Sequence, residues 1–101
     1  MFVNIIESYR SVVAVSDEDL IGKQFFEGIK QLDIKENFYK GENSKTLSKE
    51  ETKKVMIELK KEDATFNIVG EKSIQCAIEA GVINERQVLT IEGIPYSLIL
   101  L

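Results

Sequence analysis

The stretch from Asp63 to Val82 constrains the fold more than any other, because it is the longest segment with a clear helical repeat. Mostly small residues recur on one side of it at the spacing of about 3.6 residues per turn. The residues on that side are Phe66, Val69, Gly70, Ser73, Ala77 and Ala80. Asp63 is a suitable N-cap, and Gly81 suits the position just beyond the C-terminal end. The pattern predicts one central helix that packs closely against a sheet.

A second helix is indicated by the run Ser48-Lys49-Glu50-Glu51. In this capping-box pattern the Ser hydroxyl accepts a hydrogen bond from the third helical amide, and the Glu carboxylate accepts one from the Ser amide. We expect the helix to continue to about Lys61. Residues 60–63 then form either a kink or a tight turn before the central helix.

The remaining apolar segments alternate or cluster as strands do. Residues 2–7 and 12–15 predict an antiparallel hairpin, and the unbroken apolar run of residues 12–15 indicates a strand covered on both faces. A third strand is expected at Ile29–Ile34, and a closing hairpin at residues 87–91 and 96–100. The fold class is therefore α+β, with a mainly antiparallel or mixed sheet of about five strands and two helices on one face. The element order is ββ-turn-β, αα, ββ, which leaves the order of the strands in the sheet open.

The composition excludes several chemistries. The chain has 101 residues with a formal charge of −4, no His and a single Cys. Without His, neither Ser-His-Asp nor Cys-His catalysis is possible within the chain, and a zinc site of Cys and His ligands cannot form. One Cys also excludes an intramolecular disulfide, which favours a reducing, cytoplasmic setting. We expect a single domain over residues 1–101, with no signal peptide, membrane span, metal or cofactor.

A candidate polar site combines residues from the two most motif-like segments, namely Asp17, Lys23, Asn67, Gly70 and Glu71. In a functional site the turn around Asp17 and the Asn67/Glu71 pair would converge on one concave pocket. The alternative is structural, because Asn67 and Glu71 have the i,i+4 spacing of an ordinary pair on a helix surface.

Two motifs near this site have ordinary explanations. The acidic residues 17–19 offer oxygen atoms suited to Mg²⁺ or Ca²⁺, but acidic residues are also favoured at the first turn of a short helix. Residues 70–73 (Gly-Glu-Lys-Ser) have a faint likeness to the end of a phosphate-binding loop, from which the upstream glycine is missing. We favour the structural interpretation of both.

A candidate basic face is formed by Lys49, Lys53 and Lys60 on one side of the first predicted helix. Nine lysines and six acidic residues lie between Lys30 and Lys61, a local charge of +3 in an acidic chain. Such a face attracts RNA. The alternative is a solvated helix surface, and no aromatic RNA-binding signature accompanies the lysines.

Five stretches, in order along the chain, resemble the archaeal domain-of-unknown-function family 424 and together span nearly all of it. They are residues 13–23 (VAVSDEDLIGK), 26–28 (FEG), 38–41 (FYKG), 67–73 (NIVGEKS) and 91–96 (IEGIPY). The resemblance implies a small archaeal, cytoplasmic α+β protein without an assigned activity, and it favours an association with the translation machinery. The family pattern often has Cys and His where this chain has Ser16 and Tyr96. A function that needed that thiol or imidazole would be absent here.

These observations favour a non-enzymatic binding or accessory module with a protein or ribonucleoprotein partner. The alternative is a small enzyme or ligand-binding domain that uses the polar site around Asp17, Lys23, Asn67 and Glu71. A third hypothesis is self-association through the apolar end Leu98–Leu101, whose ordinary explanation is that it completes the core.

Overall fold

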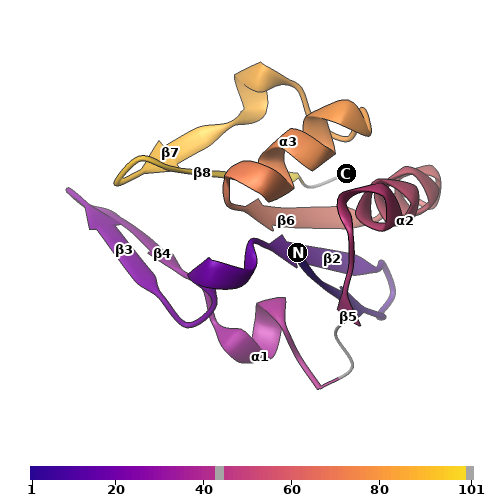
Figure 1. Ribbon diagram of the computed structural model, residues 1–101, viewed down its shortest axis with the longest axis horizontal. Helices are drawn as coiled ribbons and strands as arrows, with labels where there is room; N and C mark the ends of the chain where they lie inside the picture. The colour runs from indigo at the N-terminus through magenta and orange to yellow at the C-terminus, as the bar shows by residue number, and fades with distance from the viewer. Residues whose placement is uncertain (43–44, 100–101) are drawn as a thin grey trace.

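The protein is an α+β domain built on a six-stranded mixed sheet, which confirms the predicted class and adds one strand to the expected number (Figure 1). The computed structural model describes residues 1–42 and 45–99. The strand order is β5-β1-β2-β6-β8-β7, and β3 and β4 form a separate two-stranded sheet. The strands are β1 (Phe2–Ile6), β2 (Val12–Ser16), β3 (Gln24–Glu27), β4 (Lys30–Asp33), β5 (Lys45–Thr46), β6 (Thr65–Val69), β7 (Leu89–Ile91) and β8 (Ile94–Ile99). The helices are α1 (Glu36–Tyr39), α2 (Lys49–Lys61) and α3 (Glu71–Glu79), with 3₁₀ turns η1 (Glu18–Leu20) and η2 (Glu85–Gln87).

Strand β2 lies at the centre of the sheet, as its apolar run predicts. It pairs antiparallel with β1 on one side and parallel with β6 on the other. Val13, Ala14 and Val15 are completely buried because both faces of the strand are covered. Since β2 and β6 are parallel, their carboxyl ends lie at the same edge of the sheet.

The single helix predicted over residues 63–82 is wrong. Its first part is strand β6, and only Glu71–Glu79 is helical. Phe66 and Ile68 belong to the core cluster on one face of the sheet, and Val69 belongs to the cluster on the other face. This alternation between the two faces is that of a strand. The extended conformation of residues 65–69 is stabilised by pairing with β2 on one side and β8 on the other.

The two predicted caps of that segment have different outcomes. Asp63 is no N-cap, because it has a left-handed φ of 56° in the turn that ends α2. The junction at residues 60–63 is therefore a turn and not a kink. Gly81 follows the end of α3 with φ 76°, as predicted for a helix C-terminus.

The capping box of α2 is confirmed. The Ser48 hydroxyl accepts from the amide of Glu51 at 3.2 Å, and Glu51 Oε1 accepts from the Ser48 amide at 3.1 Å. These hydrogen bonds lower the pKa of the Glu51 carboxyl. The helix begins where the sequence pattern places it.

Helices α2 and α3 lie side by side and cover one face of the sheet, as predicted (Figure 1). Their buried side chains meet those of the strands in the larger of two core clusters. Its largest members are Phe66, Met56, Ile68, Val13 and Val15. Cys76 of α3 is buried in the same cluster, and burial raises the pKa of its thiol.

The opposite face is covered by η1, α1 and the β3–β4 hairpin (Figure 1). The smaller core cluster there comprises Ala14, Leu20, Ile34, Tyr39 and Val69. Burial raises the pKa of Tyr39 to about 12. The strand predicted at Ile29–Ile34 exists as β4, but it pairs with β3 and not with the main sheet, because Phe25 and Leu32 pack onto this face.

The closing hairpin consists of β7 and β8, joined by a two-residue turn at Glu92 and Gly93. Both turn residues have positive φ, 49° and 79°, as in the turns that match the twist of a hairpin. Strand β8 is described to Ile99. Residues 100 and 101 of the apolar end Leu98–Leu101, which was considered for self-association, lie outside the described residues. No helix in the described part of the chain is both long and apolar enough to cross a membrane.

Candidate functional site

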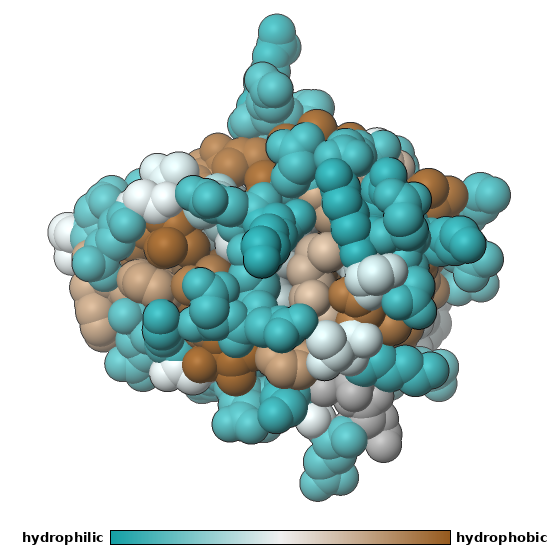
Figure 2. All heavy atoms as spheres, viewed as in Figure 1, coloured by the Kyte–Doolittle hydropathy of each residue, from teal (hydrophilic) through white to brown (hydrophobic). Residues whose placement is uncertain are grey.

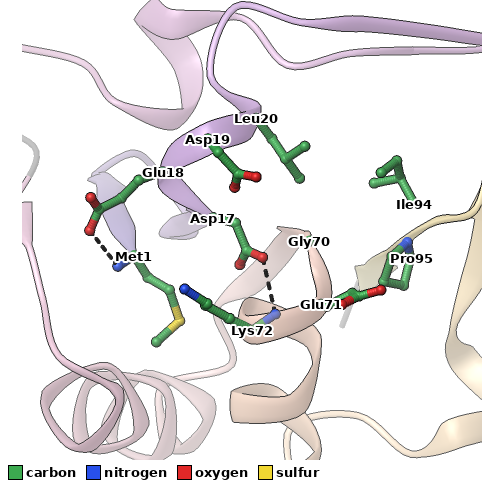
Figure 3. A pocket seen from close by; sticks show the side chains of 10 residues that line it. All are labelled: Met1, Asp17, Glu18, Asp19, Leu20, Gly70, Glu71, Lys72, Ile94 and Pro95. Carbon is green, nitrogen blue, oxygen red and sulfur yellow. Dashed lines mark hydrogen bonds and ion pairs between the residues drawn. The ribbon is translucent and has the colours of Figure 1, made fainter.

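A cleft of about 520 Å³ opens at the carboxyl ends of the parallel strands β2 and β6 (Figure 3). Asp17 follows β2, and Gly70 and Glu71 follow β6. Binding sites of α/β sheets commonly lie at this edge, because the loops that leave neighbouring parallel strands meet there. The lining residues are Met1, Asp17, Glu18, Asp19, Leu20, Gly70, Glu71, Lys72, Ile94 and Pro95.

Asp17 is bound to the first turn of α3. Its Oδ2 accepts from the Lys72 amide at 3.0 Å, and its Oδ1 accepts from the amide and the hydroxyl of Ser73 at 2.8 and 2.7 Å. The residue is only 7% exposed. Negative charge stabilises the amino end of a helix, so Asp17 joins the end of β2 to the start of α3. It does not cap η1, the short helix that it precedes.

Gly70 makes this contact possible. Its φ is 107°, and a Cβ at this position would overlap the Cγ of Asp17. Its amide donates to the carbonyl of Pro95 at 2.9 Å, so the same residue also ties β6 to β8. A residue without a side chain is required both by the backbone conformation and by the neighbouring carboxylate.

The likeness of residues 70–73 to a phosphate-binding loop has a structural explanation. The segment does connect a strand to a helix, and helix amino ends attract phosphate groups. Here the amides of Lys72 and Ser73 already donate to Asp17. An internal carboxylate thus occupies the position that a bound phosphate would take.

The other charged groups of the cleft are more exposed. Glu18 pairs with the amino group of Met1 at 3.2 Å. Asp19, Glu71 and Lys72 are exposed, and within the described residues none of them makes an ion pair. No three acidic or Cys side chains of the described residues approach one another as a metal site requires. The cleft therefore offers two free carboxylates and one free ammonium group.

A second hollow of about 440 Å³ adjoins the cleft on the side of α2. The two share Met1, Glu71 and Lys72, so they meet over the first turn of α3. The second hollow is otherwise lined by Leu47, Ser48, Lys49 and Gln75. We call the two hollows together the groove; they extend from the β8 end of the cleft to the amino end of α2, with Glu71 and Lys72 between them.

The structure brings together part of the predicted polar site. Asp17, Gly70 and Glu71 all line the cleft. Lys23 precedes β3 and Asn67 lies opposite Ala14 in the middle of β6, and neither is among the described residues that line the cleft. The i,i+4 helix spacing of Asn67 and Glu71 does not exist, because the first is in a strand.

Sequence reasoning missed several lining residues that the fold supplies. Leu20, Lys72, Ile94 and Pro95 reach the cleft from η1, α3 and β8. Lys72 directly follows Glu71 in the Gly-Glu-Lys-Ser run, so its place in the cleft could have been predicted from the sequence. The contribution of β8 depends on its pairing with β6, for which the sequence has no local signal.

The predicted basic face lies where α2 meets α3. Lys49 and Lys53 both contact the Glu79 carboxylate, at 2.6 and 3.5 Å, and Lys60 Nζ donates to the Gly81 carbonyl at 2.6 Å. The hydrogen bond from Lys49 is the main reason that the pKa of Glu79 falls to about 2. Much of this positive charge is therefore balanced inside the fold.

Ser16 and Tyr96, the two positions noted with the family resemblance, both make structural contacts in this chain. Ser16 is buried at the end of β2, and its hydroxyl donates to the Asp17 carbonyl at 2.9 Å. Tyr96 is half-buried in β8 and packs against the smaller core cluster. Neither side chain is among the described groups that line the cleft.

The fold and cleft together define a small α+β protein with a central mixed sheet covered on both faces and an open polar groove at the carboxyl ends of its two parallel strands. The chain belongs to the family described as "Protein of unknown function (DUF424)", whose model matches residues 6–101. The resemblance seen in the sequence is thereby confirmed.

A solved structure has the same fold. It is the crystal structure of an uncharacterized conserved protein from Methanopyrus kandleri, with a TM-score of 0.79 and 25% sequence identity. The match covers 97% of this chain and 88% of that one. Comparison with curated proteins finds no match.

Proposed function

We propose that the protein is a non-enzymatic binding module that holds an extended segment of a partner protein in the groove over the first turn of α3. The observation that carries this proposal is the joining of two hollows, of about 520 and 440 Å³, across Glu71 and Lys72. An elongated open groove suits an extended chain better than a compact substrate, which prefers an enclosed pocket.

The charge of the cleft favours a protein over a nucleic acid. Within the described residues, Asp19 and Glu71 line it without an ion pair, and one unpaired ammonium group, that of Lys72, lies beside them. Acidic groups repel phosphates and attract basic side chains. A partner segment that carries both signs, with a basic excess, fits this arrangement.

The contacts of Asp17 argue against its use as a general acid or base. A catalytic carboxylate needs a free oxygen within hydrogen-bond reach of the substrate. Both oxygens of Asp17 accept hydrogen bonds from the first turn of α3. The buried acid of the cleft thus has a structural role in this proposal.

The setting we propose is the cytoplasm, with a partner in the translation machinery. The single buried Cys has no disulfide partner in the chain, as is usual in a reducing compartment. An association with ribosomal or initiation proteins is the hypothesis drawn from the family resemblance, and the experiment below includes it.

A second candidate function is the binding of a small molecule in the cleft alone. The volume of about 520 Å³ lies in the range of small-ligand sites. A thermal-shift screen of polar metabolites would support this function if a compound stabilised the wild-type chain but not a Glu71→Lys variant. A screen without such a compound leaves the partner-protein proposal in place.

The main experiment is affinity purification of the tagged protein from its native cells, with and without RNase, followed by mass spectrometry. An Asp19→Lys, Glu71→Lys variant changes the cleft, and a Glu58→Lys, Glu62→Lys variant makes the same charge change at the other end of α2. We expect proteins that copurify with the wild type and the control but not with the cleft variant, whether or not RNase is present. Equal recovery by all three would contradict the groove, and loss on RNase treatment would contradict a direct protein contact.

A further inference from the structure

The end of the molecule formed by the β3–β4 and β7–β8 hairpins exposes large apolar side chains without a structural need for them. Phe26 is 55% exposed, Leu89 is 51% exposed, and Ile29 at the tip of β3–β4 is fully exposed. In Figure 2 hydrophobic residues appear between hydrophilic ones at this end, to the left of the view. Clustered exposed apolar groups on a small protein indicate a surface that binds something.

Ile29 is the clearest case. It follows Gly28, whose φ of 62° starts the two-residue turn between β3 and β4. Turn positions are normally taken by Gly, Asn, Asp or Ser, which the turn geometry and water both favour. An isoleucine gains nothing there from the fold itself, since it is completely exposed.

The hairpin that carries Phe26 and Ile29 is fixed to its neighbour. The Phe26 amide donates to Glu92 Oε2 at 2.7 Å, and the Glu92 amide donates to Glu27 Oε1 at 3.0 Å. Phe25 and Leu32 pack against the smaller core cluster beneath. A lone two-stranded hairpin is marginally stable, so these contacts hold the exposed side chains in one orientation before any partner arrives.

The same contacts leave acidic groups where the two hairpins meet. Glu27 and Glu92 each use one carboxylate oxygen for the other hairpin, and within residues 1–42 and 45–99 neither makes an ion pair. Lys30 lies opposite Glu27 in the strand register, yet no ion pair joins them in that part of the chain. This end of the molecule therefore carries exposed apolar side chains and, at the junction of the hairpins, two neighbouring carboxylates without an ion pair among the described residues.

We infer that this hairpin end is a docking surface for a protein segment that presents an arginine or lysine between apolar side chains. The cation would contact the free oxygens of Glu27 and Glu92, and the apolar neighbours would cover Phe26 and Ile29. Charge complementarity selects this occupant, because two neighbouring carboxylates without an ion-pair partner attract a basic side chain. The surface is separate from the groove, so neither proposal depends on the other.

The test is a titration of the ¹⁵N-labelled protein with the peptide acetyl-Leu-Arg-Leu-Arg-Leu-amide, followed by backbone amide shifts. Acetyl-Leu-Glu-Leu-Glu-Leu-amide is the control for charge. We expect shifts centred on Phe26, Gly28 and Glu92 with the Arg peptide, and binding at least about tenfold weaker for the Glu peptide. Equal affinity for the two peptides, or shifts centred elsewhere, would overturn the proposal.

Two variants make the test specific. Phe26→Ser, Ile29→Ser removes the apolar part of the surface, and Tyr9→Ser, Ile57→Ser removes a matched exposed pair far from it. We expect the first to weaken Arg-peptide binding about tenfold or more and the second to leave it unchanged. If the wild type self-associates in sedimentation velocity and only the first variant is monomeric, the occupant is a second copy and the basic-segment proposal is wrong.

Discussion

The two faces of the sheet are covered in different ways. On one face two regular helices, α2 and α3, enclose a core whose largest side chains have no exposure to water. On the other face a 3₁₀ turn, a one-turn helix and a two-stranded hairpin cover a smaller cluster. The helical face is built for stability, whereas the segments on the other face end in exposed groups such as Phe26 and Ile29. The helical face thus supplies most of the buried core, and the hairpin face carries the exposed apolar groups of the proposed docking surface.

The groove lies where these two regions meet. Asp17 belongs to the loop that leaves β2 for the hairpin face, yet its carboxylate is bound by α3 of the helical face. This contact fixes the position of the segment after β2 relative to the start of α3. The variants below therefore measure how much each face of the sheet, and the Asp17 contact between them, contributes to the free energy of unfolding.

The largest effect is expected from the helical core. Phe66→Ala should lower the free energy of unfolding by about 3–5 kcal/mol, because the side chain is fully buried and its loss leaves a cavity. Phe25→Ala on the hairpin face should cost only about 1–2 kcal/mol, since that side chain is half-buried. Urea denaturation monitored by circular dichroism measures both. Equal losses would show that the two faces contribute alike.

The next effect is expected at Gly70. Gly70→Ala should destabilise the protein by about 3 kcal/mol, because it adds backbone strain and an overlap with Asp17. Gly81→Ala is the matched control, with positive φ but open space around the added methyl group, and should cost only about 1 kcal/mol. If the two variants were equally stable, the close approach of Asp17 to Gly70 would not matter.

A smaller effect is expected from the carboxylate that joins the faces. Asp17→Ala should cost about 2–3 kcal/mol, because it leaves the Ser73 hydroxyl and two helix amides without their acceptor. Asp17→Asn keeps one acceptor oxygen and should recover about half of that loss. Thermal unfolding of the three proteins in one buffer provides the comparison. An Asp17→Asn variant as unstable as Asp17→Ala would point to the charge alone.

The smallest effect is expected at the surface of the helical face. The pKa of Glu79 is lowered from 4.5 to about 2, chiefly by the hydrogen bond from Lys49. A group whose pKa is lower in the folded state stabilises the protein above its unfolded pKa and loses that contribution as the pH falls. The difference in unfolding temperature between wild type and Glu79→Gln should therefore be full above about pH 5 and vanish toward pH 2. High salt should reduce it at neutral pH, and a difference that grows on acidification would contradict this origin.

Local signals in the sequence predicted some elements correctly and misled at one. The capping box at Ser48 and Glu51 located α2 because both hydrogen bonds lie within four residues. The segment after Asp63 has small residues that fit a helix seam, and it also has the run Thr65–Val69, whose β-branched and aromatic members fit a strand. Pairing with β2 and β8 decided between the two, and those partners are far away in the chain.

The candidate site shows the same limit. Asp17, Gly70 and Glu71 were found because their surroundings look like motifs, and they do line one cleft. The role of Asp17 was not predictable from its own neighbours, since it binds amides 55 and 56 residues further along the chain. Ile29 was predicted to begin a strand, and its exposed place in the turn between β3 and β4 follows from the pairing of these two strands, which the sequence did not predict.

The parallel pairing of β2 with β6 also bears on how the chain folds. Ala14 lies beside Asn67, so the edge of β2 is unpaired until two-thirds of the chain has been synthesised. Until then the free edge of the apolar strand β2 can pair with another unfolded chain, which is a risk of aggregation. Long-range pairings of this kind fold slowly compared with local ones. The protein should therefore depend on chaperones during synthesis more than its short length suggests.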